Sequence, residues 1–126
     1  MADQDLRILL VEDEAIIALE VETLLRQASF DVVACGSLQS GLSEAEKQPF
    51  DAAVLDVNLH GQMSFPLADA LAAKNVPFIF VSGYEIEIVP RQHRRRPFVG
   101  KPFLAQKLLK ALSGAMGGAQ PLATIA

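Results

Sequence analysis

The stretch Leu6–Asp13, which reads Leu-Arg-Ile-Leu-Leu-Val-Glu-Asp, decides the fold class. Its apolar run is short and nearly continuous, which is typical of a β-strand that is covered on both faces, and it stops at two acids. Further runs of this kind lie at 30–34, 52–55, 76–81 and 97–100. Apolar residues at helical spacing predict helices over 14–28, 38–45, 64–73 and 103–115.

This alternation of short strands and helices predicts an α/β fold. A short strand can return parallel to its neighbour only through a crossing element, so we expect an open, doubly wound sheet of five parallel strands. The segment Glu85–Arg96 is the exception, because it contains Pro90 and keeps no apolar period. We expect it to be irregular or to form a short helix. Glycines after the last helix predict one domain over 1–115 and a flexible C-terminal tail over 116–126.

The composition is that of one globular domain. The chain has 126 residues, of which 51% are hydrophobic and 21% are charged. The net charge of −4 argues against a nucleic acid partner. Cys35 is the sole cysteine, so no internal disulfide can form, and His60 and His93 share no metal-ligand spacing. The sequence has neither a basic signal region nor an apolar stretch of roughly 20 residues, so we expect a cytoplasmic protein with no membrane contact.

Polar residues follow the ends of the predicted strands, where ligands gather in open α/β sheets. These residues are Glu12, Asp13, Asp56, Asn58, Ser82, Gly83 and Lys101. Neighbouring strands lie about 4.8 Å apart, so adjacent first and third strands would bring three carboxylates into one pocket. Their mutual repulsion requires that some of them be protonated or that a cation bind. Hard oxygen ligands favour Mg²⁺, with the Asn58 carbonyl as a further ligand.

A carboxylate beside such a cation can act as a nucleophile toward a phosphoryl group and form an acyl phosphate. Asp56 is the natural nucleophile, because Glu12 and Asp13 can serve the metal. Lys101 and the Ser82 hydroxyl would bind the phosphoryl oxygens. Each residue alone is more often a helix cap or a turn residue, but their joint occurrence at the strand ends favours a phosphate and magnesium site.

Four segments together resemble the CheY-like receiver domain of two-component response regulators, over the chain from Leu6 to about Ala115. They are the stretches 9–14 (Leu-Leu-Val-Glu-Asp-Glu), 53–59 (Ala-Val-Leu-Asp-Val-Asn-Leu), 80–84 (Phe-Val-Ser-Gly-Tyr) and 100–103 (Gly-Lys-Pro-Phe). The resemblance implies a flavodoxin-like sheet of strand order 2-1-3-4-5. It also implies that Asp56 accepts phosphate from a phosphohistidine on a sensor histidine kinase.

The resemblance further implies a role for each site residue. Asp13, Asp56 and the Asn58 carbonyl would hold the metal, with Glu12 acting mainly through water. Ser82 and Lys101 would bind the phosphoryl oxygens, and Phe98 would occupy the aromatic switch position. Receivers that resemble this one also have a cis peptide before the proline, here Lys101-Pro102.

The chain departs from the usual receiver between Asp56 and Lys101, where it is shorter by several residues. The Ser-Gly-Tyr sequence after the fourth strand resembles the FATGUY receiver subgroup, although Val81 and Ser82 replace Ala and Thr. That resemblance implies a short or mobile fourth helix and a partner kinase of the HWE class. Phe98 has no hydroxyl, so we expect Tyr84 to take part in the switch with Ser82.

The favoured function is a stand-alone receiver that exchanges phosphate on Asp56 and signals to an unknown downstream protein, with magnesium-dependent self-phosphorylation and dephosphorylation as its only chemistry. An aspartate-nucleophile phosphatase is one alternative, but it needs a second Asp where this chain has Asn58. A receiver-like binding module that is never phosphorylated is another. The arginine cluster at 91–96 is either a docking patch or a solvated loop, and the acidic composition favours the loop.

Overall fold

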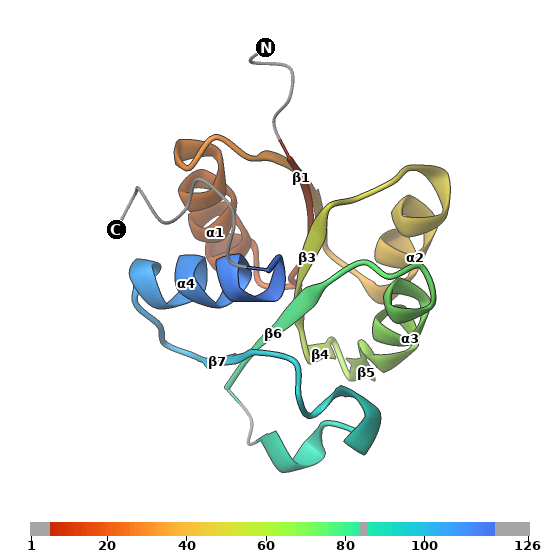
Figure 1. Cartoon of the computed structure of the whole chain (residues 1–126). Coiled ribbons are helices and arrows are strands. Elements are labelled where there is room, and N and C mark those ends of the chain that lie inside the picture. The colour runs from red at the N-terminus through yellow and green to blue at the C-terminus, as the bar shows by residue number, and fades with distance from the viewer. Residues whose placement is uncertain (1–5, 84–85, 118–126) are drawn as a thin grey trace.

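A computed structural model describes residues 6–83 and 86–117, and it contains one central parallel sheet (Figure 1). The strands lie in the order β2 (Asp31–Cys35), β1 (Arg7–Val11), β3 (Ala52–Asp56), β6 (Phe78–Ser82) and β7 (Phe98–Gly100). All neighbours pair in parallel. Numbered along the chain as five sheet strands, this is the order 2-1-3-4-5, so the flavodoxin-like prediction is confirmed.

Helices cover both faces of the sheet (Figure 1). Helices α1 (Ala15–Gln27) and α4 (Ala105–Ala115) lie on one face, and α2 (Leu38–Lys47) and α3 (Phe65–Ala73) lie on the other. In β1, Ile8 and Leu10 belong to the core on the α1 and α4 side, whereas Leu9 and Val11 belong to the core on the opposite side. Burial of both strand faces explains why the strands read as continuous apolar runs.

Gly41 lies where α2 comes close to α3 and to β1. A Cβ added there would lie 2.9 Å from Leu67 of α3 and 3.1 Å from Val11 of β1. The glycine therefore lets α2 pack directly on the sheet and on α3, which offsets its poor helix propensity.

A small antiparallel hairpin that the sequence analysis did not foresee follows β3. Strands β4 (Asn58–Leu59) and β5 (Gln62–Met63) pair across a two-residue turn. Both turn residues, His60 and Gly61, have positive φ angles of 53° and 86°. This is the pattern of a type I′ turn, which matches the natural twist of paired strands.

The connection from β6 to β7 agrees with the expected short fourth helix. It contains two 3₁₀ helices, η2 (Ile86–Ile88) and η3 (Arg91–His93). These short helices also agree with the irregular or short-helix segment expected over Glu85–Arg96. Val89 and His93 of the connection are buried, whereas Arg91, Arg94 and Arg95 are exposed. Tyr84 and most of the expected tail, from residue 118 onward, lie outside the described residues.

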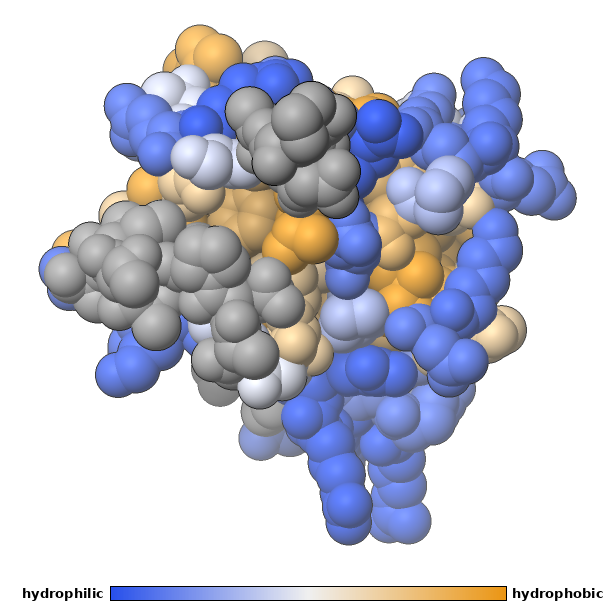
Figure 2. Space-filling view, turned by 45° about the horizontal axis from the view of Figure 1, so that its top comes forward, coloured by the Kyte–Doolittle hydropathy of each residue, from blue (hydrophilic) through white to orange (hydrophobic). Residues whose placement is uncertain are grey.

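The surface seen in Figure 2 is mainly hydrophilic, with apolar areas in hollows framed by polar side chains. One described hollow, of about 350 Å³, lies between α2 and α3 and includes Phe50 and Leu71 in its lining. Among the described helices, each is too short or too polar to cross a bilayer.

Candidate functional site

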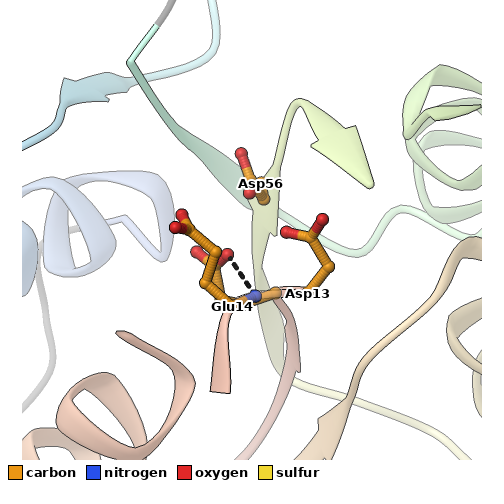
Figure 3. A group of neighbouring side chains, drawn as sticks. Asp13, Glu14 and Asp56 are labelled. Atoms are coloured by element: carbon orange, nitrogen blue, oxygen red, sulfur yellow. Dashed lines mark hydrogen bonds between the residues drawn. The ribbon is translucent and has the colours of Figure 1, made fainter. Parts of the chain in front are cut away.

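Four carboxylates converge at the carboxyl edge of the sheet (Figure 3). Glu12 and Asp13 directly follow β1, and Asp56 ends β3, the strand that pairs with β1. One carboxylate oxygen from each of Glu12, Asp13, Glu14 and Asp56 lies within 4.8 Å of the others. The predicted acidic pocket is therefore present. Glu14 is an addition, because its sequence position identified it only as the start of a helix.

Lys101 reaches this pocket from the end of β7. Its Nζ lies 2.8 Å from Glu12 Oε1, 3.2 Å from Asp56 Oδ2 and 3.3 Å from Glu14 Oε1. The Lys101 backbone N–H donates a hydrogen bond to the Ser82 carbonyl, which fixes the Lys101 main chain beside the end of β6. The Lys101-Pro102 peptide is cis, as predicted. The long Lys101 side chain thus reaches from β7 past β6 to Asp56 at the end of β3.

Glu12 is nearly fully buried, and contacts engage both of its carboxylate oxygens. Oε1 faces the Lys101 ammonium, and Oε2 accepts a hydrogen bond from the Glu14 backbone N–H at 3.1 Å. Burial raises the pKa of Glu12 from 4.5 to about 7, although the contacts with Lys101 and Glu14 act in the opposite direction. The same contacts act on Lys101: burial lowers its pKa, but Glu12 and Asp56 outweigh burial and raise it.

Asp13 is held by the unforeseen hairpin. Its Oδ2 accepts a hydrogen bond from the His60 backbone N–H at 2.8 Å, and His60 Nδ1 lies 3.3 Å from the same oxygen. Burial acts to raise the pKa of Asp13, but these contacts with His60 and a side-chain contact with Glu12 lower it overall. Nothing in the sequence spacing of His60 indicates this contact, and the fold brings His60 beside Asp13 across 47 positions. The available signal for the turn was weak: glycine adopts positive φ freely, and histidine adopts it more often than most residues.

The other predicted residues lie nearby in different roles. The Asn58 side-chain Oδ1 accepts a hydrogen bond from the Gly61 backbone N–H at 2.7 Å, so it stabilises the turn. Ser82 is the buried last residue of β6, one position beyond the residue that pairs with Asp56. Phe98 begins β7 and packs, half-buried, against the core on the α2 and α3 side. The predicted switch residue Tyr84 lies outside the described part of the chain.

The donor set of the pocket fits Mg²⁺. Crowded carboxylate oxygens are the hard ligands that this ion prefers, and their closeness calls for more positive charge than Lys101 alone provides. Asn58, whose carbonyl is the further ligand expected from the sequence, begins β4 two residues after Asp56. The exposed His60 imidazole lies beside Asp13, and the His60 backbone N–H donates a hydrogen bond to the same carboxylate.

Comparisons with known proteins give a consistent result. The family model described as response regulator receiver domain matches residues 8–113. The sensory transduction protein RegX3 of Mycolicibacterium smegmatis is 32% identical over 81% of this chain and 46% of its own length. The transcriptional regulatory protein PdtaR of Mycobacterium tuberculosis is 25% identical over 84% of this chain and 54% of its own length. The chain thus spans about half the length of these curated relatives.

Solved structures of similar proteins match nearly the whole chain. SdrG from Sphingomonas melonis is 38% identical, with a TM-score of 0.78 over 92% of this chain and 98% of that one. A response regulator receiver protein from Sinorhizobium medicae is 25% identical, with a TM-score of 0.80 over 93% and 98%. The receiver domain of the sensor histidine kinase PA1611 from Pseudomonas aeruginosa shares the fold at 22% identity, with a TM-score of 0.75 over 90% and 98%; it is described with a magnesium ion in its active site cleft.

Proposed function

Because the chain belongs to the response regulator receiver domain family, we propose that it is a single-domain response regulator of a two-component phosphorelay. In this proposal residues 1–115 form the receiver, and Asp56 accepts a phosphoryl group from a sensor histidine kinase in the cytoplasm. Phosphorylation then changes binding to a downstream protein. The observation that carries the proposal is the Lys101 ammonium 3.2 Å from Asp56 Oδ2 in a pocket of converging carboxylates.

The proposed metal ligands are Asp13, Asp56 and the Asn58 carbonyl, with Glu12 acting through water. The engagement of both Glu12 oxygens supports this indirect role. The magnesium described in the PA1611 receiver, which has the same fold, supports Mg²⁺ as the ion. When bound, Mg²⁺ supplies positive charge to the phosphoryl oxygens.

The proposed transfer uses the groups of this chain as follows. An Asp56 carboxylate oxygen forms a bond to phosphorus while the P–N bond of the phosphohistidine breaks, and the released imidazole takes up a proton. Lys101 exchanges its contact with Asp56 Oδ2 for one with a phosphoryl oxygen, and the Ser82 hydroxyl donates to another. The Lys101 ammonium starts 3.2 Å from Asp56 Oδ2. Ser82 is on the adjacent strand, one residue beyond the pairing partner of Asp56, so the proposal takes its hydroxyl as the second donor to the new charge.

An exposed apolar groove supports a protein, the sensor kinase, as the phosphodonor. The groove has a volume of about 500 Å³ and lies between α1 and the start of α4. Ile16 and Leu19 line it and are 80% and 65% exposed, and Leu104, next to lining residue Phe103, is 73% exposed. Apolar side chains at this exposure are typical of a docking surface. The HWE class of the kinase rests on the resemblance to the FATGUY subgroup alone.

The aspartate-nucleophile phosphatase is less well supported. It needs an acid and base two residues after the nucleophile, and Asn58 there has an amide that cannot exchange a proton in this way. Its Oδ1 is also committed to the Gly61 N–H. The chemistry of position 58 therefore favours a phosphoacceptor over a hydrolase.

The test is incorporation of phosphate from a small phosphodonor in the presence of Mg²⁺. The native chain should gain one hydroxylamine-labile phosphate, and Asp56→Asn should gain none. Asp51→Asn is the matched control, since Asp51 is an exposed aspartate that contacts the Arg7 backbone N–H. Labelling of Asp56→Asn would refute the assignment of the phosphoacceptor. A native chain that takes no phosphate, yet binds a partner, would support the non-phosphorylated module.

A further inference from the structure

We infer that the His60-Gly61 turn positions Asp13 as a metal ligand through one oxygen, and that it thereby makes the pocket prefer Mg²⁺ over Ca²⁺. The inference rests on the proposed function in one respect, because it takes the acidic pocket to be a magnesium site. His60 is a positioning residue in this account. Its backbone N–H, rather than its imidazole, does the positioning.

The turn is fastened at several points and holds a defined shape. Gly61 N–H donates to Asn58 Oδ1 at 2.7 Å, and Asn58 and Leu59 pair with Met63 and Gln62. The Ser64 N–H donates to the Val57 carbonyl at 2.8 Å and closes the base of the hairpin. Both ends of the turn are therefore tied to the residues that follow Asp56.

From this fixed turn one donor points at the pocket. The His60 N–H lies 2.8 Å from Asp13 Oδ2, across 47 positions of sequence. The imidazole is 75% exposed, so the backbone contact is the better fixed of the two. A hydrogen bond to a carboxylate is stronger than one between neutral groups. The turn therefore holds Asp13 Oδ2 in place and restricts rotation of the carboxylate.

A carboxylate held in this way suits one ion better than the other. Mg²⁺ demands near-octahedral geometry with short bonds, which single carboxylate oxygens satisfy. Ca²⁺ takes more ligands and often binds both oxygens of a carboxylate. Since the turn engages one Asp13 oxygen and limits rotation of the carboxylate, it works against the coordination that Ca²⁺ favours.

The position also explains why the backbone, and not the side chain, is the part to test. His60 has φ of 53°, a conformation that glycine adopts readily and proline cannot adopt. His60→Gly keeps the N–H and the turn geometry but removes the imidazole. His60→Pro removes the N–H. The two variants therefore separate the backbone contribution from that of the side chain.

The experiment is a calorimetric titration of the full chain with Mg²⁺ and with Ca²⁺, each as the chloride. Loss of a group that orients a metal ligand typically weakens binding about 10-fold to 100-fold. We expect His60→Pro to lose Mg²⁺ affinity in this range and Ca²⁺ affinity less, so that the preference for Mg²⁺ falls. His60→Gly keeps the N–H and removes only the exposed imidazole, so it should lose less Mg²⁺ affinity than His60→Pro.

Three results would overturn the inference. They are native Mg²⁺ affinity in His60→Pro, equal losses in His60→Pro and His60→Gly, and an unchanged ratio of the two ion affinities in His60→Pro. A native chain that binds no Mg²⁺ would instead refute the proposed magnesium site itself, so the two failures are distinguishable.

A second measurement does not depend on folding of the proline variant. In metal-free protein, exchange of the His60 amide hydrogen should be slow in the native chain and in Asp13→Asn, which keeps a side-chain acceptor. In Asp13→Ala it should be at least about tenfold faster, as expected when a hydrogen bond of about 1.4 kcal/mol is lost. Equal exchange in the two Asp13 variants would show that Asp13 does not hold the turn.

Discussion

Two connections leave the carboxyl edge of the sheet near Asp56, and they are held in opposite ways. The hairpin at 57–64 is fastened by polar contacts that lead into the pocket, through His60 to Asp13 and through Gly61 to Asn58. The described part of the β6–β7 connection, 86–97, is fastened by burial away from the pocket, through Val89 and His93. The hairpin therefore holds Asp13 and Asn58 in place. The β6–β7 connection instead meets the site at Ser82, the last residue of β6.

His93 is the main anchor of the β6–β7 connection. Its side chain is 3% exposed, and Nε2 donates to Asp69 Oδ1 of α3 at 2.7 Å, while the ring lies edge-on to Phe78 with centroids 5.5 Å apart. Within the described residues Nδ1 has no hydrogen-bond partner. The connection is therefore held mainly by the packing of His93 and Val89 and by the hydrogen bond of His93 to α3, a small set of contacts that a moderate signal can rearrange.

The largest effect is expected from His93→Ala. Removing a buried ring together with its hydrogen bond should lower the free energy of unfolding by about 2 to 3 kcal/mol. Urea denaturation followed by circular dichroism measures this change. Asp69→Asn is the control, because it keeps an acceptor for His93, and it should lose less than about 1 kcal/mol. A loss below that value in His93→Ala would mean that the connection is anchored elsewhere.

The next effect concerns the response to phosphorylation. A phosphate mimic bound at Asp56 should draw Ser82 and Lys101 inward, and the segment from Tyr84 to Val99 should reorganise at a coupling energy of about 1 to 3 kcal/mol. Hydrogen exchange with and without beryllofluoride should therefore change most in this segment and less in the hairpin at 57–64. Unchanged exchange there, with a response in α1 or α2, would place the output face elsewhere.

Sequence reasoning predicted the sheet and the pocket because both follow from local patterns. Continuous apolar runs report burial on both faces, and polar residues at their ends report a shared edge. The sequence pattern therefore correctly places Glu12, Asp13, Asp56 and Lys101 in one pocket. The role of Glu14 was missed, since a helix-start acid and a pocket acid look the same in sequence.

The two connections were harder to predict because their contacts are long-range or involve the backbone. The His60 N–H carries no side-chain signature, and only the positive φ of the turn directs it at Asp13. His93 sits among arginines in a polar segment, so nothing local indicates that it is buried against α3. Short turns and single anchors of this kind require the tertiary structure.

The hairpin side of the comparison is tested by the separate roles of Asp13 and Lys101. Asp13→Ala removes a proposed metal ligand from the pocket, so it should weaken Mg²⁺ binding at least as much as His60→Pro, by about 10-fold to 100-fold. Lys101→Ala removes a competing positive charge 2.8 Å from Glu12, so it should keep or raise Mg²⁺ affinity while blunting the response to the phosphate mimic. Calorimetry measures both affinities, and equal losses would contradict the separate roles.

The smallest effect is expected from Arg96→Ala, and it decides whether the arginine cluster at 91–96 is merely solvated. The Arg96 guanidinium carbon lies 4.4 Å from the ring centroid of Phe78, the same ring that packs against His93. A partly exposed cation over an aromatic ring contributes about 0.5 to 1 kcal/mol, so Arg96→Ala should lower the free energy of unfolding by that amount.

Arg95→Ala is the matched control for this last test, because Arg95 is an exposed neighbour of the same charge. It should leave the free energy of unfolding within about 0.5 kcal/mol of the native value, as surface substitutions usually do. Arg96 and His93 both pack on the Phe78 ring. In a His93→Ala background the ring is held less firmly, so the effect of Arg96→Ala on the free energy of unfolding should be smaller. Additive losses in the double variant would mean that Arg96 and His93 act independently, and the β6–β7 connection would then have two anchors instead of one.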